Sequence, residues 1–118
     1  MSQVQLLEKI YSNEIEENLK LILSTLEDGK ALDLQVIDLE GKTNIAKYMV
    51  ITSGRSGFHA GGLAQKLIKS LKESKVKYIS VEGLTESQWI LIDLLDIIIN
   101  IFHPGVREIY NLEKMWKI

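Results

Sequence analysis

Apolar residues recur with helical periodicity through the first 29 residues of the chain. Acidic side chains gather on the opposite face, and Gly29 is placed to end the helix. Ser12 or Asn13 could cap a second helix, so residues 1–29 form either one amphipathic helix or two helices with a bend. The apolar stripe must pack against another element, and it comprises Leu6, Leu7, Ile10, Tyr11, Ile15, Leu19, Ile22, Leu23 and Leu26.

The pattern changes from helical spacing to strand spacing after this segment. Apolar and polar residues alternate over residues 32–36, which predicts a half-buried strand. Residues 41–44 have the composition of a turn, and the continuous apolar run 48–52 predicts a central strand that is covered on both faces.

A second amphipathic helix is expected after the turn Ser53-Gly54-Arg55-Ser56. Its apolar stripe lies within residues 60–71, while Lys66, Lys69 and Lys72 face water. A lysine row can contact nucleic acid, but no aromatic residue interleaves this one, so a solvated helix face is favoured. The turn could bind an anion, yet it lacks the glycine-rich phosphate-binding patterns, and a serine helix cap is the favoured interpretation.

Three further strands complete the predicted sheet. Residues 78–81 form the third strand, reached by a crossover long enough for a parallel pair with the second. Residues 89–93 and 97–102 are joined by a short connection and therefore pair antiparallel. Pro104 suits the first turn of a helix, and the residues from Val106 onward form a mainly apolar C-terminal segment.

The expected fold is therefore α/β (α+β), a single domain over residues 1–118. Residues 1–29 are its helical segment, and residues 31–118 form a five-stranded mixed sheet with helices packed on it. A chain of 118 residues is long enough for one core and too short for two. The absence of cysteine excludes disulfides and thiolate chemistry, and no secretion signal or membrane-length apolar run is present, so a cytoplasmic protein is expected.

Charge is distributed unevenly along the chain. The segment 78–106 contains Glu82, Glu86, Asp93 and Asp96 but no lysine or arginine. The rest of the chain holds all 14 basic residues and 12 of the 16 acidic ones (16 − 4). Such a segment is unsuited to nucleic acid and favours a basic protein partner, so a protein-binding module is the first hypothesis.

The residues that could support catalysis or metal binding give weak signals. His59 and His103 are far apart in the sequence, and neither has the histidine partner of a helical metal site, so structural roles are favoured. Asp93 and Asp96 could pair as acid and base or hold a metal, but turn formation and partner contact are equally weighted alternatives. No cofactor or metal is expected.

Trp89 lies in the middle of the acidic segment and permits two interpretations. A tryptophan in a strand is usually a core residue. The neighbouring residues 90–94 are apolar except for Asp93, however, so both faces of this strand need cover that one small domain does not supply. A partner, or a second copy of the chain, could provide it.

From about residue 31 to 117 the chain resembles the ribosomal silencing factor family, also called the Iojap-like family. The motifs that carry the resemblance are individually modest, but their order and spacing are specific. They are Ala31-Leu32-Asp33, Tyr48-Met49-Val50-Ile51, Ser53-Gly54-Arg55-Ser56 with His59, Val81-Glu82-Gly83, Trp89-Ile90-Leu91-Ile92-Asp93, Asp96-Ile97-Ile98-Ile99, Phe102-His103-Pro104, Arg107, Tyr110 and Leu112-Glu113-Lys114-Met115-Trp116.

The resemblance implies a sheet domain of nucleotidyltransferase-like topology without the paired catalytic aspartates. It also implies a partner, ribosomal protein fourteen of the large subunit. Family members bind that protein on the face that meets the small subunit, and so block subunit joining when nutrients are short. Trp89 matches the family's partner-contacting tryptophan, with Glu82 and Ser87 in the same motif. Three positions depart from the family's usual residues: Asn100 replaces a histidine, Lys47 an acid, and Ile109 an aromatic.

We therefore expect a ribosome-binding translation repressor, not an enzyme, that acts sterically and binds neither DNA nor membrane. The alternatives are a large-subunit assembly factor and a nucleotidyltransferase-like enzyme using the Ser53 turn and Asp33. A homodimer of the free protein is also possible. The predicted partner-binding residues are Trp89, Glu82, Ser87, Ile90, Asp93 and Asp96.

Overall fold

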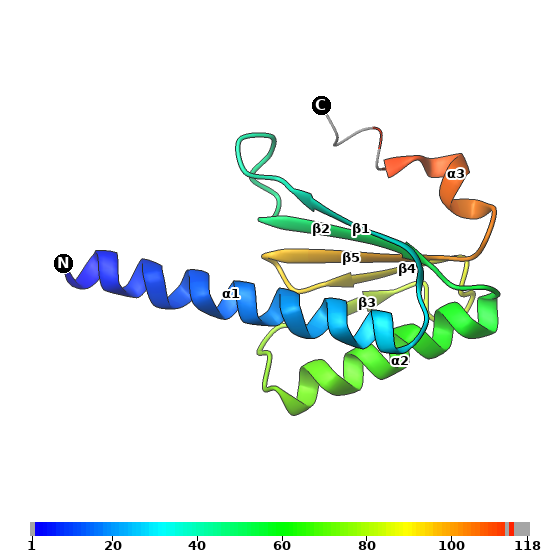
Figure 1. The fold of residues 1–118 in the computed structure, drawn as a ribbon, viewed down its shortest axis with the longest axis horizontal. Helices are drawn as coiled ribbons and strands as arrows, with labels where there is room; N and C mark the ends of the chain where they lie inside the picture. Colours follow the sequence, from blue (N-terminus) through cyan, green and yellow to red (C-terminus); the bar gives the residue numbers. More distant parts are fainter. Residues whose placement is uncertain (1, 113, 115–118) are drawn as a thin grey trace.

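The computed structural model describes residues 2–112 and 114 of the chain. Its elements follow one another as three helices and five strands, and Figure 1 shows α1 and α2 lying together on one side of a single sheet. In order they are α1 (Gln3–Asp28), β1 (Leu32–Asp38), β2 (Tyr48–Ser53), α2 (Gly57–Glu73), β3 (Ser80–Glu82), β4 (Trp89–Asp93), β5 (Ile97–Phe102) and α3 (Val106–Tyr110). This arrangement confirms the expected single α+β domain with a five-stranded mixed sheet.

Helix α1 is one continuous helix. Ser2 caps its start through a reciprocal pair of hydrogen bonds with Gln5, and Gly29 ends it as predicted. A Cβ at Gly29 would lie 2.5 Å from the Leu63 side chain, so the absence of a side chain lets α1 and α2 approach each other closely. Neither Ser12 nor Asn13 starts a second helix, because the helical hydrogen bonding runs through both residues without a break.

The strand order is β1-β2-β5-β4-β3, with β2 and β5 parallel and all other neighbours antiparallel. The predicted parallel pairing of the third strand with the second is therefore wrong. Strand β3 is only three residues long and pairs with β4 at the edge, while the β4–β5 hairpin places β5 beside β2. The crossover through α2 leads from β2 to the edge strand β3, whereas the parallel neighbour of β2 is β5.

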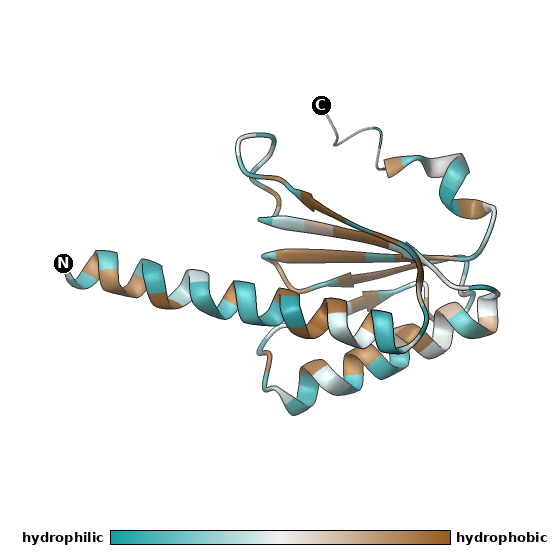
Figure 2. Ribbon diagram, viewed as in Figure 1, coloured by the Kyte–Doolittle hydropathy of each residue, from teal (hydrophilic) through white to brown (hydrophobic). Residues whose placement is uncertain are grey.

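Residues alternate between the two faces of the sheet, and each face has its own core. The face under α1 and α2 carries the larger core, to which β5 contributes Ile97, Ile99 and Ile101. The opposite face carries a smaller cluster of Ile37, Leu39, Met49, Ile51 and Phe102. Figure 2 shows strands that are mainly apolar and helices in which apolar and polar residues alternate along the turns.

The C-terminal segment covers part of the second face. Val106 and Leu112 pack against the smaller cluster there. Helix α3 starts after Gly105, which has a φ of 86°, so Pro104 lies in the preceding turn and not in the first turn of the helix as predicted. Met115 and Trp116, predicted to extend this apolar segment, lie outside the described residues. In the described part of the chain, no helix has the length and apolar character needed to cross a bilayer.

Candidate protein-binding site

In the part of the chain that the structure describes, no helix covers the second face of the sheet over β3 and β4. Trp89, the predicted partner contact, packs against the smaller cluster on this face. The register pairs Trp89 with Phe102 and Leu91 with both Glu82 and Asn100. Since alternate residues of a strand share a face, Trp89, Leu91 and Asp93 point to the same side of β4. Trp89, Leu91 and Ile98 are half-buried, and Glu82 is exposed at the edge. We call this surface, made by Glu82, Trp89, Leu91, Asp93 and Ile98, the acidic face.

Trp89 is neither sealed in the core nor free in solvent. Its ring stacks on Phe102, with ring centroids 5.3 Å apart and an interplanar angle of 27°. Its indole N–H donates to the side-chain oxygen of Asn100 at 2.9 Å, and Asn100 itself is 1% exposed. The amide of Asn100 in turn donates to the carbonyl oxygen of Val50 at 3.4 Å. The indole is thus held in one orientation with part of its surface open.

Asp93 and Asp96 do not act as a pair in this structure. Asp93 accepts a hydrogen bond from the backbone N–H of Leu95 at 2.7 Å, which stabilises the turn between β4 and β5. Asp96 accepts a hydrogen bond from the hydroxyl of Tyr11 on α1, and this bond raises the pKa of Tyr11. Asp96 therefore lies at the hairpin end near α1, whereas Trp89 begins the strand at the other end.

Ser87 and Ile90 have different surroundings from those expected. Ser87 lies in the loop before β4, has a φ of 55°, and donates its hydroxyl to the carbonyl oxygen of Leu84 at 2.9 Å. Ile90 is 0% exposed and belongs to the core beneath α1 and α2, so its predicted role as a partner contact is wrong. Alternation along the strand turns Ile90 away from the face that carries Trp89.

Two apolar features of the surface were not predicted from the sequence. Leu91 and Ile98 extend the acidic face, and their pairing across the strands was needed to find them. Phe58, in the first turn of α2, is 94% exposed. It follows Gly57, whose Cβ position would lie 3.3 Å from the His103 ring. Phe58 falls outside the apolar stripe of α2, and that is the signal that could have identified it.

The turn before α2 is a helix cap. The Ser56 hydroxyl accepts from the backbone N–H of His59 at 3.1 Å. Nδ1 of His59 accepts from the N–H of Arg55 at 2.8 Å, so the other ring nitrogen carries the proton that bonds the Gly29 carbonyl oxygen at 2.7 Å. His59 thus ties the end of α1 to the start of α2, which confirms the structural role predicted for it.

The residues proposed for an enzymatic alternative, Asp33 and Ser53, lie near each other, because Leu32 pairs with Ser53 across β1 and β2. Asp33 is exposed at an irregularity between β1 and β2, where its φ is 49°. Ser53 accepts from the guanidinium of Arg107 at 3.3 Å. Among the residues that the structure describes, no three His, Asp or Glu side chains gather as metal ligands.

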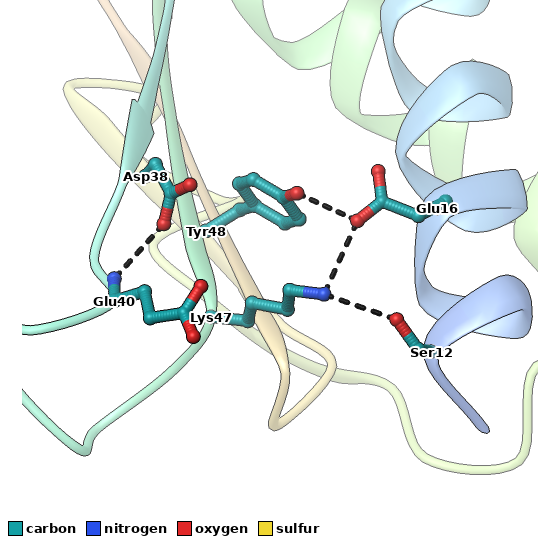
Figure 3. A network of polar contacts seen from close by, with 6 residues as sticks. All are labelled: Ser12, Glu16, Asp38, Glu40, Lys47 and Tyr48. Atoms are coloured by element: carbon teal, nitrogen blue, oxygen red, sulfur yellow. Dashed lines mark hydrogen bonds and ion pairs between the residues drawn. The ribbon is translucent and has the colours of Figure 1, made fainter. Parts of the chain in front are cut away.

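A polar network fastens the middle of α1 to the sheet (Figure 3). Lys47 lies 3.2 Å from the Glu16 carboxylate and donates to the Ser12 hydroxyl at 3.3 Å. The Tyr48 hydroxyl donates to Glu16 at 2.6 Å. This bond raises the pKa of Tyr48 to about 12 and lowers the pKa of Glu16. Lys47, where the resemblance leads to the expectation of an acidic residue, thus helps to fasten α1 to the sheet.

Comparison with known proteins shows how this fold and site relate to others. The family model described as "Ribosomal silencing factor during starvation" matches residues 12–118. A ribosomal silencing factor RsfS of Zymomonas mobilis is 47% identical over 98 residues, which cover 83% of this chain and 74% of that protein. The RsfS of Bacillus subtilis is 33% identical over 98 residues, which cover 83% of this chain and 83% of that protein.

The comparisons extend to solved structures and to an organellar relative. A crystal structure of a protein from Chromobacterium violaceum matches with a TM-score of 0.84 and 31% identity, covering 87% of this chain and 86% of that one. A mouse protein named for mitochondrial assembly of the ribosomal large subunit is 30% identical over 86% of this chain and 46% of its own length. The chain belongs to the ribosomal silencing factor (RsfS) family.

Proposed function

We propose that this silencing factor binds ribosomal protein fourteen on the large subunit through the acidic face and thereby blocks joining of the small subunit. The observation that carries the proposal is the state of Trp89: half-buried, fixed by Asn100 and Phe102, and open on one side. A rigid aromatic ring loses little conformational freedom on binding, which makes it an effective interface anchor.

The charge of this surface supports a basic protein as the partner. Glu82 is exposed beside the tryptophan, and Asp93 is half-buried on the same face. No lysine or arginine occurs between residues 78 and 106, so a cationic partner meets no repulsion from this segment. Family membership supports the ribosome as the location of that partner, because the relatives are named as ribosomal silencing factors.

The proposed mechanism is steric and needs no cofactor or catalytic group. It predicts that purified large subunits preincubated with the protein fail to join small subunits in a light-scattering assay. Trp89→Ala should restore joining, whereas the control Tyr78→Ala, which removes an exposed aromatic residue outside the acidic face, should not. Undiminished joining in the presence of saturating wild-type protein would refute the steric mechanism.

Assembly of immature large subunits is the second candidate function. The observation in its favour is the similarity to the mouse protein that is named for such assembly. Gradient sedimentation of a cell extract separates the two, because a silencing factor accompanies mature large subunits and an assembly factor accompanies lighter precursors. Calorimetry with nucleotides, with and without Mg²⁺, tests the enzymatic alternative in the same preparation.

The homodimer of the free protein remains a prediction. The sequence pattern places it on the uncovered strand face, but the C-terminal segment occupies part of that face through Val106 and Leu112.

A further inference from the structure

Helix α2 and the turns that flank it carry a concentrated positive charge. Residues 55–77 hold six of the 14 basic residues of the chain and one of its 16 acidic residues, which gives a formal charge of +5 (6 − 1). The whole chain has a net charge of −2, so the other residues together carry −7 (−2 − 5). The side of α2 that faces away from the sheet is therefore a cationic surface on an otherwise acidic protein.

The lysines of this surface have no partner in the part of the chain that the structure describes. Five of the six basic residues are lysines on α2 or just after it, and all five are exposed. Among the described residues, none of these five side chains forms an ion pair or a hydrogen bond. Binding an anion therefore breaks no contact within the domain. The five residues are Lys66, Lys69, Lys72, Lys75 and Lys77.

An aromatic residue lies on the same side of the helix. No aromatic residue interleaves the lysines in the sequence, but successive residues of an α-helix are about 100° apart. Phe58 therefore lies within about 40° of Lys69 and Lys72 around the helix axis, and about 17 Å from Lys69 along it. Phe58 is 94% exposed. We call the surface made by Phe58, Lys66, Lys69 and Lys72 the cationic side of α2; the buried residues of the helix face the opposite way and are Ala60, Leu63, Ala64, Leu67 and Leu71.

The surface between the aromatic ring and the lysines is open. Gly62, one turn after Phe58, has nothing within 4 Å of the position that its Cβ would occupy. Packing therefore does not require this glycine, although glycine weakens a helix interior relative to alanine. A shallow hollow of about 420 Å³ follows, with Ile68 and Leu84 beside Lys69 and Lys72. A flat ring has room to lie against Phe58, and an anion has room beside the lysines.

These features favour RNA over an anionic membrane. Lysines bind phosphates without regard to sequence, and an exposed aromatic ring stacks on an unpaired base. A helix that lies in a membrane interface presents an apolar face to the lipid. Helix α2 buries its apolar stripe against the sheet, and Phe58 is the one large apolar side chain that it exposes.

The cationic side of α2 begins at the end of the molecule that holds Trp89. A Cβ at Gly57 would lie 3.3 Å from the His103 ring, and the backbone N–H of His103 donates to the carbonyl oxygen of Gln88 at 2.9 Å. Gln88 directly precedes Trp89, so the start of α2 and the start of β4 are neighbours. A basic protein at Trp89 and an RNA segment beside it can therefore contact one copy of the chain at the same time.

We propose that the cationic side of α2 binds RNA of the large ribosomal subunit. The ammonium groups of Lys66, Lys69 and Lys72 contact phosphates, and Phe58 stacks on an unpaired base. This is a second contact, separate from the acidic face. The choice of large-subunit RNA rests on the proposed function, which places the protein on that subunit.

Fluorescence anisotropy with a labelled single-stranded RNA of mixed sequence, about 12 nucleotides long, tests the proposal on the full chain. The triple variant Lys66→Gln, Lys69→Gln and Lys72→Gln should bind this RNA at least about tenfold more weakly than the wild type at low salt. Its affinity should also depend less on salt concentration, because fewer counterions are released. Circular dichroism verifies that the variant is folded.

The matched control removes the same charge from another surface. The triple variant Lys9→Gln, Lys20→Gln and Lys30→Gln replaces three exposed lysines on or just after α1 and should bind the RNA within about twofold of the wild type. An equal loss in the two triple variants would overturn the proposal, as would a wild type that does not bind the RNA. Binding to phosphatidylglycerol vesicles in place of RNA would assign the cationic side of α2 to a membrane instead.

Phe58 permits a test of stacking and of the RNA source. Phe58→Ala should weaken RNA binding about fivefold or more, while Phe58→Trp should retain it. With p-benzoylphenylalanine in place of Phe58, irradiation of the protein bound to purified large subunits should cross-link it to ribosomal RNA. Cross-links to ribosomal proteins alone would overturn the assignment to RNA.

Failure of this proposal can be distinguished from failure of the proposed function. The Lys66, Lys69 and Lys72 variant should bind isolated ribosomal protein fourteen like the wild type, and Trp89→Ala should bind the RNA like the wild type. A wild type that binds the RNA but not ribosomal protein fourteen would refute the proposed function alone. A wild type that binds ribosomal protein fourteen but neither the RNA nor ribosomal RNA in the subunit would refute the present proposal alone.

Discussion

The indole N–H of Trp89 donates to the side-chain oxygen of Asn100 across the β4–β5 pair, at a distance of 2.9 Å. Asn100 is almost fully buried, so this bond satisfies an interior polar group and orients the half-buried ring at the same time. The resemblance places Asn100 where a histidine is expected, and the contact gives Asn100 a defined structural role. The orientation of the proposed anchor thus depends on a residue from the neighbouring strand.

Removing this support should weaken both the fold and the binding. Asn100→Ala leaves the indole N–H without its partner and creates a small cavity, so we expect a loss of about 1–3 kcal/mol in the free energy of unfolding. Urea unfolding followed by circular dichroism measures it. Affinity for large subunits should also fall, because the ring loses its fixed orientation. Unchanged stability together with unchanged affinity would contradict the role assigned to Asn100.

Trp89 should dominate the affinity for the large subunit. Trp89→Ala removes the proposed central anchor, and we expect a loss of about 2–4 kcal/mol in binding free energy. A pull-down titration with purified large subunits measures this loss. Trp89→Phe retains the aromatic surface but not the bond to Asn100, so its affinity should be intermediate. Full-strength binding by a folded Trp89→Ala protein would remove the acidic face from consideration.

Ile90 offers the complementary experiment, because it follows Trp89 in the sequence but points into the other core. Ile90→Ala should lower the free energy of unfolding by about 2–4 kcal/mol, as expected for a fully buried isoleucine. The affinity of the folded fraction for large subunits should stay close to that of the wild type. A selective loss of affinity without a loss of stability would mean that Ile90 reaches the partner after all.

Glu82 should affect the rate of association more than the lifetime of the complex. It is exposed at the edge of the acidic face, where a charge steers a cationic partner but is screened by salt. We expect Glu82→Gln to lower the association rate constant by several-fold at low salt, with little change in dissociation. Surface plasmon resonance at two salt concentrations resolves the two rates. An association rate that is independent of salt for both proteins would refute charge steering.

The contact between Tyr48 and Glu16 should make stability depend on pH at both extremes. The Tyr48 pKa is raised from 10.0 to about 12, so its contribution is complete below pH 10 and is lost as the pH rises toward 12. The Glu16 pKa is lowered from 4.5, so its contribution is present above that pH and is lost on acidification through the lower folded value.

Comparing the wild type with Tyr48→Phe isolates this contribution from other titrating groups. The difference in free energy of unfolding should be constant near neutral pH and should shrink above pH 10. Tyr11→Phe serves as the control, because Tyr11 is the second tyrosine whose pKa is raised and it bonds Asp96, not Glu16. A difference between wild type and Tyr48→Phe that persists unchanged to pH 12 would contradict the assignment.

Local patterns were sufficient for most of the elements. Helical spacing and Gly29 predicted the end of α1, alternation predicted β1, and the short connection at residues 94–96 predicted the β4–β5 hairpin. These features depend on residues close together in the chain, whose spacing reflects the geometry of the element that they form. The predicted parallel pairing of β2 with β3 was wrong for the opposite reason. Which of β3 and β5 lies beside β2 depends on packing between residues that are far apart in the chain.

The composition of the acidic segment, its single tryptophan and the family resemblance were already present in the order of the amino acids. The alignment of the five strands and the two helices on one face decided whether that tryptophan is open or buried. They also decided that Ile90 beside it is a core residue and not a partner contact. The Tyr11–Asp96 and Tyr48–Glu16 bonds join residues that are distant in the chain. Such contacts arise from packing, and no local periodicity encodes them.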